Sequence, residues 1–253
     1  MADNKPIVYF LHGLPGSPHD AELLHRTVTD KYHVIPLDYL ALHSGKDFNG
    51  IVQAFDTDLM SRDDNPVKLV GFSLGAMVAI RLAAARPEKV ESLTLVSPAA
   101  PLSLGNFLSE MAGKPVFTLA QKSPRTLAGL TCLQAAMARF APHFLIKQLF
   151  QKPGILERHL LADPSFQNIV ADGMKHSFTA HRQAYLSLLQ LYVSDWSKVL
   201  DDVQCPVEIW HGAQDKWAPL AMSDALCREL QKPPKLHVIP DAEHYSTLSK
   251  TVI

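Results

Sequence analysis

The sequence has no excess of charge of one sign and no long uninterrupted apolar run. Lys and Arg number 24 against 25 Asp and Glu in 253 residues, a formal net charge of -1. Such a balance offers no basic surface for nucleic acid and no polybasic anchor for an anionic membrane, so we expect neither partner and predict a small-molecule ligand. No apolar run reaches the roughly 20 residues that a membrane-spanning helix needs.

Cysteine is scarce, and the local signatures of metal and nucleotide sites are absent. The three cysteines, Cys132, Cys205 and Cys227, are odd in number and far apart, which favours free thiols in a reducing compartment. The first residues lack the features of a secretory signal peptide, so we expect a cytoplasmic protein. No H-E-x-x-H, paired C-x-x-C, Asp-rich calcium loop, G-x-G-x-x-G or Walker loop occurs, and we therefore expect neither a metal nor a cofactor.

Short apolar runs do alternate with helical periodicity, both in the first hundred residues and near the end. This alternation predicts right-handed crossovers and a mostly parallel sheet with helices on both faces, an α/β fold. We expect about six strands, at residues 7–11, 32–37, 67–72, 92–96, 207–210 and 236–239. We expect the helices of this core at residues 21–28, 51–59, 76–85 and 219–230.

Between residues 101 and 195 the strand-like runs vanish and helical periodicity dominates, with expected helices at 127–140, 144–150, 155–161 and 178–192. We expect this segment to be a helical cap, inserted into an α/β core made of residues 1–100 and 196–253. Four of its residues could line a substrate pocket: His176, Phe178, His181 and Tyr185. An amphipathic helix packed on the core would show the same spacing, and we favour that structural interpretation.

The most specific motif is the G-x-S-x-G pentapeptide at residues 71–75, between an apolar run and an Ala-rich helical stretch. A strand, a tight turn and a helix are the context of a nucleophile elbow, in which small residues at Gly71 and Gly75 avoid collisions as the chain reverses. Ser73 could instead be an ordinary helix N-cap, but a cap does not require glycine on both sides. We therefore predict that Ser73 is a nucleophile.

A serine hydroxyl needs a general base, and the base needs an acid that orients it. Asp215 and His244 follow Ser73 in the expected order, each just past a predicted strand, so all three fall at the carboxyl edge of the sheet. Asp215 could instead cap the helix that begins near residue 219. His12 and His211 also end predicted strands, and we expect them to serve local turns.

Together these motifs resemble the α/β-hydrolase superfamily over most of residues 6–248. The resemblance rests on residues 12–17 (HGLPGS), the elbow, residues 211–216 (HGAQDK) and His244. Within the superfamily the sequence is similar to small cap-bearing serine esterases, including those that act on pimeloyl methyl esters, and to peroxidase-like hydrolases. Only nine residues follow His244, fewer than the family's usual terminal helix, which predicts weak support for the His244 loop.

The resemblance implies a cofactor-independent serine hydrolase that cleaves a carboxylic ester through an acyl-enzyme on Ser73. His244 would act as the base, Asp215 would orient it, and the backbone N–H groups of Leu14 and Leu74 would form the oxyanion hole. Two alternatives stay open. One is a lyase, C–C hydrolase, thioesterase or perhydrolase that uses the same triad, and the other is a non-catalytic ligand-binding protein of this fold. The substrate and the oligomeric state do not follow from the sequence.

Overall fold

A sheet of six parallel strands lies at the centre of the protein, whose computed structural model describes residues 5–43, 48–61 and 66–253. The order across the sheet is β2-β1-β3-β4-β5-β6, and every neighbouring pair is parallel. The strands are β1 (Ile7–Leu11), β2 (His33–Pro36), β3 (Val67–Phe72), β4 (Val90–Val96), β5 (Val207–Gly212) and β6 (Lys235–Ile239). The predicted α/β fold with about six parallel strands is confirmed.

The strand order reverses at β1, which pairs with β2 on one side and with β3 on the other. β1 is a continuous apolar run and β3 is apolar apart from Lys68, and both are buried along most of their length, as expected for strands covered on both faces. In open α/β sheets, ligands bind outside the carboxyl ends of the strands at such a switch point. The loops after β1 and β3 therefore lie where a ligand site is expected, and they carry Leu14 and Ser73.

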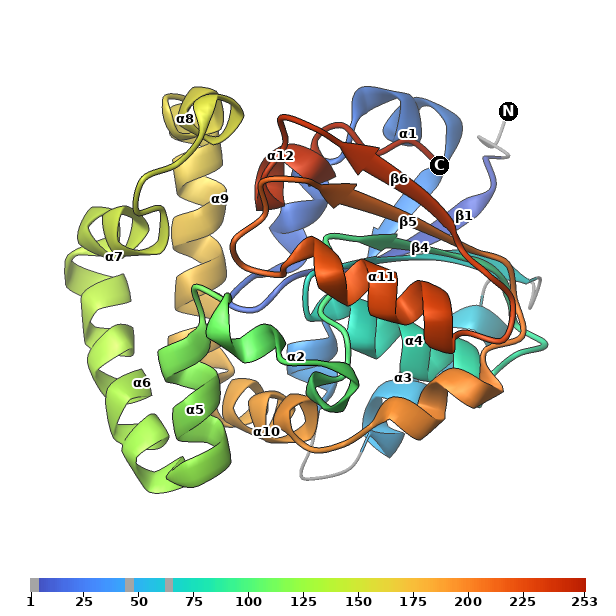
Figure 1. Cartoon of the computed structure of the whole chain (residues 1–253), viewed down its shortest axis with the longest axis horizontal. Helices are drawn as coiled ribbons and strands as arrows, with labels where there is room; N and C mark the ends of the chain where they lie inside the picture. Colours follow the sequence, from blue (N-terminus) through green and yellow to red (C-terminus); the bar gives the residue numbers. More distant parts are fainter. Residues whose placement is uncertain (1–4, 44–47, 62–65) are drawn as a thin grey trace.

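Helices outside residues 101–195 flank the sheet (Figure 1). They are α1 (Arg26–Lys31), α2 (Tyr39–Leu42), α3 (Asn49–Met60), α4 (Gly75–Ala85), α11 (Leu220–Glu229) and α12 (His244–Leu248). The predicted helix at 21–28 is wrong. Ser17 and Pro18 instead start a 3-10 helix, η1 (Pro18–Leu23), and the extended backbone of Leu24 separates it from α1. Local capping there outweighs the apolar spacing on which the prediction rested.

Residues 101–195, called the helical segment below, contain helices and no strand. Their α-helices are α5 (Lys114–Lys122), α6 (Pro124–Phe140), α7 (Pro142–Leu149), α8 (Ile155–Leu161), α9 (Pro164–Lys175) and α10 (Arg182–Val193). Proline begins three of them, a position where its missing N–H costs nothing. The single helix predicted at 178–192 is wrong at its start, because a π-helical turn, η4 (His176–Ala180), precedes α10.

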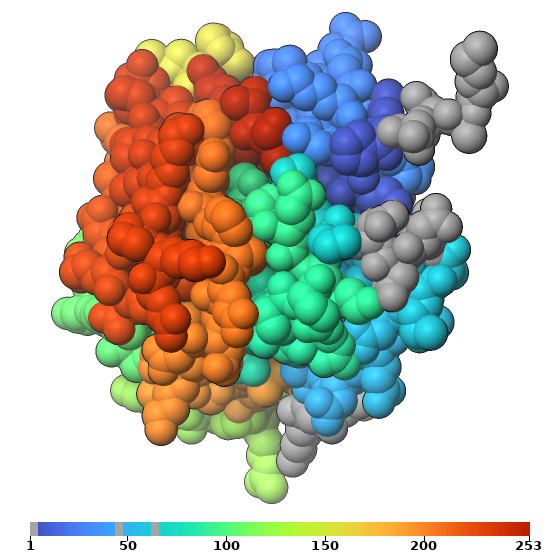
Figure 2. Space-filling view, turned by 90° about the vertical axis from the view of Figure 1, so that its right-hand side faces the viewer, coloured from blue at the N-terminus to red at the C-terminus, as the bar shows by residue number. Residues whose placement is uncertain are grey.

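The helical segment lies beside the sheet, with α5 to α9 gathered on one side of it (Figure 1). It meets the rest of the chain where α9 contacts η1 and where α8 contacts α12. On another face of the molecule, the orange and red surface of the C-terminal part lies against the green surface (Figure 2), in agreement with the pairing of β4 and β5. Among the described residues, no helix combines the length and apolarity needed to cross a membrane.

Candidate active site

Ser73 lies on a sharp turn between β3 and α4, with a backbone φ of 56°. A non-glycine residue in this left-handed region costs roughly 1–2 kcal/mol, and such strain concentrates at functional sites. The flanking glycines are sterically required. A Cβ on Gly75 would lie 2.2 Å from the carbonyl oxygen of Leu11, and one on Gly71 would lie 2.7 Å from the Cα of Ala76. The strand, turn and helix therefore hold Ser73 as an elbow requires.

Asp215 and His244 meet in a buried hydrogen bond. The Nδ1 of His244 donates to Oδ2 of Asp215 at 2.7 Å, and both side chains are almost fully buried. The other carboxylate oxygen of Asp215 accepts from the backbone N–H groups of Trp217, at 2.8 Å, and Ala218, at 3.0 Å. Burial opposes ionisation, but the charge and hydrogen bond of His244 hold the pKa of Asp215 below its usual value.

One oxygen of the Asp215 carboxylate therefore holds the imidazole of His244, and the other stabilises the turn that follows Asp215. It does not cap α11, which begins at Leu220 with Pro219 before it. The alternative interpretation of Asp215 as the cap of this helix is wrong.

His244 is supported from the helical segment, although few residues follow it. It is the first residue of α12, where Glu243 and Ser246 form a reciprocal capping box. Glu157, from α8, accepts hydrogen bonds from the backbone N–H groups of Tyr245, at 2.7 Å, and Ser246, at 3.4 Å. Burial raises the pKa of Glu157 to about 7. The expectation of weak support for this loop is wrong, because α12 and Glu157 brace it.

Aromatic rings pack against the imidazole of His244. Trp217 stacks on it with ring centroids 5.6 Å apart, and Phe72, which precedes Ser73 in the elbow, lies 4.8 Å away. Within the described part of the chain, no hydrogen bond joins the Ser73 hydroxyl to His244. Contacts of this kind are often long without substrate and tighten when it binds. Trp217 was not predicted from the sequence, although it lies only two residues after Asp215.

His211 has a structural role, as expected. Its Nε2 lies 2.8 Å from the carbonyl oxygen of Ala218, which can only accept, so this nitrogen carries the proton. Its Nδ1 then accepts from the hydroxyl of Ser223 at 2.6 Å. Burial lowers the pKa of His211, which keeps the ring neutral beside Asp215.

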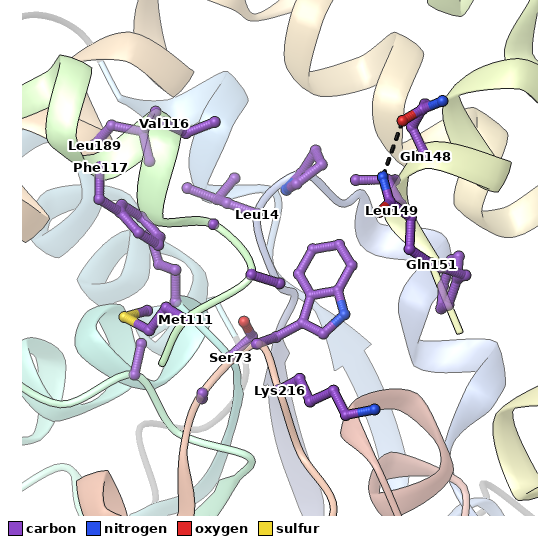
Figure 3. A pocket seen from close by; sticks show the side chains of 18 of the residues that line it. Leu14, Ser73, Met111, Val116, Phe117, Gln148, Leu149, Gln151, Leu189 and Lys216 are labelled. Carbon is purple, nitrogen blue, oxygen red and sulfur yellow. Dashed lines mark hydrogen bonds between the residues drawn. The ribbon is translucent and has the colours of Figure 1, made fainter. Parts of the chain in front are cut away.

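A cavity of about 320 Å³ opens beside Ser73 (Figure 3). Its apolar side is formed by Met111, Val116, Phe117, Phe178, Tyr185 and Leu189. Gln148 and Gln151, joined by a hydrogen bond of 3.0 Å, line another side, and Lys216 lies near Ser73 (Figure 3). Phe178 and Tyr185 thus line the cavity as well as packing in the core, whereas His176 and His181 are not among its lining residues.

Leu14 and Leu74 also line the cavity next to Ser73. Leu14 follows β1 and Leu74 precedes α4, so their backbone N–H groups come from the two loops at the switch point. Neither N–H donates a hydrogen bond to another described residue. Two free donors beside a serine are what an oxyanion site needs.

Comparison with known proteins places the chain in a family. The model of the alpha/beta hydrolase family matches residues 8–250, so the chain belongs to that family. It is 27% identical to the pimeloyl-[acyl-carrier protein] methyl ester esterase of Neisseria meningitidis serogroup C, over 98% of this chain and 90% of the relative. Relatives of this kind support hydrolase activity for the chain.

Solved structures show the same fold. A bromoperoxidase from Bacillus anthracis matches with a TM-score of 0.68 and 18% identity, over 97% of this chain and 87% of that one. An esterase from Exiguobacterium antarcticum matches with a TM-score of 0.64 and 17% identity, over 94% and 85% of the two chains. At such identities the likeness concerns the fold alone.

Proposed function

We propose that this protein hydrolyses carboxylic esters through an acyl-enzyme formed on Ser73. The observation that carries the proposal is the buried hydrogen bond of 2.7 Å between Asp215 and His244, whose imidazole packs against Phe72, the residue before the strained, cavity-lining Ser73. An ionised carboxylate on Nδ1 leaves the other ring nitrogen as the basic one, which is the tautomer that a general base needs.

In the first half of the reaction, the Ser73 oxygen attacks the ester carbonyl while His244 takes the hydroxyl proton. The carbonyl oxygen becomes an oxyanion, and the N–H groups of Leu14 and Leu74 donate to it. Each such donor is worth on the order of 3 kcal/mol in the barrier. The intermediate then expels the alcohol, which leaves with the proton from His244.

In the second half, His244 takes a proton from water, and the resulting hydroxide attacks the acyl carbonyl on Ser73. Collapse of this second intermediate releases the carboxylic acid and returns the proton to the Ser73 oxygen. Asp215 stays ionised throughout and stabilises the imidazolium that forms twice in each cycle. The cycle needs no cofactor.

The lining of the cavity favours an apolar acyl group. Phe117, Phe178 and Leu189 offer aromatic and aliphatic surface on one side, whereas Gln148 and Lys216 offer polar groups elsewhere. We infer that the acyl chain packs on the apolar side and that the alcohol part faces the polar groups. The name of the Neisseria relative describes an esterase for a methyl ester of an acyl group, which agrees with an acyl chain on the apolar side.

Labelling and kinetics with one matched pair of variants test the proposal. The wild-type protein should react with a fluorophosphonate probe and hydrolyse p-nitrophenyl acyl esters. Ser73→Ala should lose labelling and at least about 10⁴-fold in kcat, whereas Ser109→Ala, at an exposed serine, should keep both. A folded Ser73→Ala protein with wild-type ester hydrolysis would refute the mechanism.

The alternatives give different results in the same set of assays. A lyase, C–C hydrolase, thioesterase or perhydrolase would label at Ser73 but convert diketones, thioesters or peroxide faster than simple esters. A ligand-binding protein without catalysis would leave Ser73 unlabelled in a folded chain. A cytoplasmic location stays a prediction, supported by the three cysteines, which are all free in the structure.

A further inference from the structure

Two histidines and one aspartate, residue types that often bind metals, lie close together outside the cavity described above. His12 follows β1, Asp38 precedes α2, and His176 begins the π-helical turn η4 of the helical segment. One nitrogen or oxygen of each lies within 4.8 Å of the others, and Nε2 of His176 is 3.0 Å from Oδ1 of Asp38. The core and the helical segment thus contribute ligands to one small cluster.

His12, one member of this cluster, has a buried nitrogen with a free lone pair. Its Nδ1 lies 2.8 Å from the carbonyl oxygen of Gly13, which can only accept, so Nδ1 carries the proton and Nε2 carries the lone pair. The Nε2 atom is buried and has no hydrogen-bond partner among the described residues. A neutral imidazole whose other nitrogen donates to a carbonyl is the usual form of a metal ligand.

The geometry suits a small ion. Three atoms within 4.8 Å of one another share a point that is no more than about 2.8 Å from each, and zinc binds imidazole nitrogen and carboxylate oxygen at about 2.0–2.2 Å. Each ligand atom therefore needs to move by less than about 1 Å. Two imidazoles and one carboxylate suit zinc and related first-row ions, whereas magnesium and calcium prefer oxygen ligands alone.

We infer that His12, Asp38 and His176 form a binding site for a divalent transition-metal ion such as Zn²⁺, which ties the helical segment to the core. The ion would reach the site through His176 and Asp38, whose side chains are 17% and 30% exposed. It would replace the proton that His176 shares with Asp38, since a coordinating imidazole nitrogen must be unprotonated. The π-helical turn that begins at His176 supports the inference, because such turns often mark functional positions.

A plain hydrogen bond between His176 and Asp38 explains two of the three side chains but leaves the Nε2 of His12 buried without a partner. Buried polar atoms in proteins generally have one. An ordered water could fill that role instead of an ion, provided that the other groups hold it. No local motif marks this cluster, because its three side chains are far apart in the sequence, and a metal bound here would differ from the expectation that none is bound.

Titration calorimetry with ZnCl₂ tests the site in the full chain after treatment with EDTA and dialysis. Wild type should bind one Zn²⁺ per chain. His176→Gln and Asp38→Asn should each weaken that binding at least about 10-fold. Asparagine still accepts the hydrogen bond that Asp38 receives from the N–H of Ala41, so α2 keeps its cap. His159→Gln, at an exposed histidine of the same segment, is the matched control and should bind Zn²⁺ like wild type.

Melting curves with EDTA and with ZnCl₂ complete the test. Variants that melt cooperatively in EDTA are folded, and Zn²⁺ should raise the melting temperature of wild type and His159→Gln but not of His176→Gln. The inference is overturned if wild type binds no stoichiometric Zn²⁺, as expected for a site that holds only water. It is also overturned if both ligand variants bind as tightly as wild type, because the ion then lies elsewhere. Neither result depends on ester hydrolysis.

Discussion

Glu157 offers a test of how the helical segment is joined to His244. Its side chain is 3% exposed, and one carboxylate oxygen accepts from the backbone of Tyr245 and Ser246. The other oxygen is buried without a partner among the described residues. Burial is the main reason that the pKa rises from the ordinary value of 4.5 to about 7, and the hydrogen bonds from the backbone offset it in part.

This shift predicts the direction of a pH effect. Between pH 4.5 and about 7 the folded chain keeps the proton of Glu157, whereas the unfolded chain has lost it. Because the folded state binds more protons in this window, the free energy of unfolding falls as the pH rises through it. At about 1.4 kcal/mol per pH unit, the contribution of Glu157 that is present at pH 4.5 and lost by pH 8 is about 3 kcal/mol.

The variant Glu157→Gln keeps an acceptor oxygen for the N–H of Tyr245 but cannot titrate. Urea unfolding of both proteins at pH 4.5 and at pH 8 measures the effect. The stability of the variant relative to wild type should rise by about 3 kcal/mol between the two pH values. Glu229→Gln, at an exposed position, is the control and should track wild type. An equal difference between Glu157→Gln and wild type at both pH values would refute the reasoning, since other groups titrate alike in the two proteins.

Three further substitutions have expected outcomes. Gly75→Ala places a Cβ 2.2 Å from the carbonyl oxygen of Leu11, so we expect a loss of more than about 3 kcal/mol, and an unchanged melting temperature would contradict this. Asp215→Asn no longer fixes the tautomer of His244, so kcat for p-nitrophenyl esters should fall about 10⁴-fold in a folded protein, and a loss below tenfold would contradict the role of the carboxylate. Burial raises the pKa of Asp20 to about 8, so Asp20→Asn should gain at least about 2 kcal/mol relative to wild type between pH 5 and pH 9 in urea unfolding, a gain that would be absent if the carboxyl were ionised throughout.

Much of the core could be predicted because its signals are local. β1 and β3 are mostly apolar runs. The elbow is recognisable from Gly71 and Gly75, because neighbouring backbone approaches both positions too closely for a side chain. The prediction of a helix at 21–28 is wrong because the cap at Ser17 starts η1 and the extended backbone of Leu24 ends it. The break before α10 leaves no mark in the apolar pattern, because Phe178 before it and Tyr185 after it are both buried.

The candidate active site, like the core, contains residues that carry a local sequence signal and residues that do not. Asp215 and His244 follow strand ends in a recognisable order, and the structure brings them together. Glu157 carries no local signal, because a glutamate within a helix is ordinary until another element buries it. The same holds for His12 and His176, which are far apart in sequence and meet only through the packing of η4 near the end of β1.

Glu157 accepts hydrogen bonds from the first turn of α12, which matters for the engineering of this protein. Replacing the helical segment with one from another protein, a common way to change substrate preference, would remove Glu157 and its support of α12. It would also remove the residues of this segment that line the cavity. Turnover and selectivity would then change together, unless the replacement segment supplies a carboxylate at the same place.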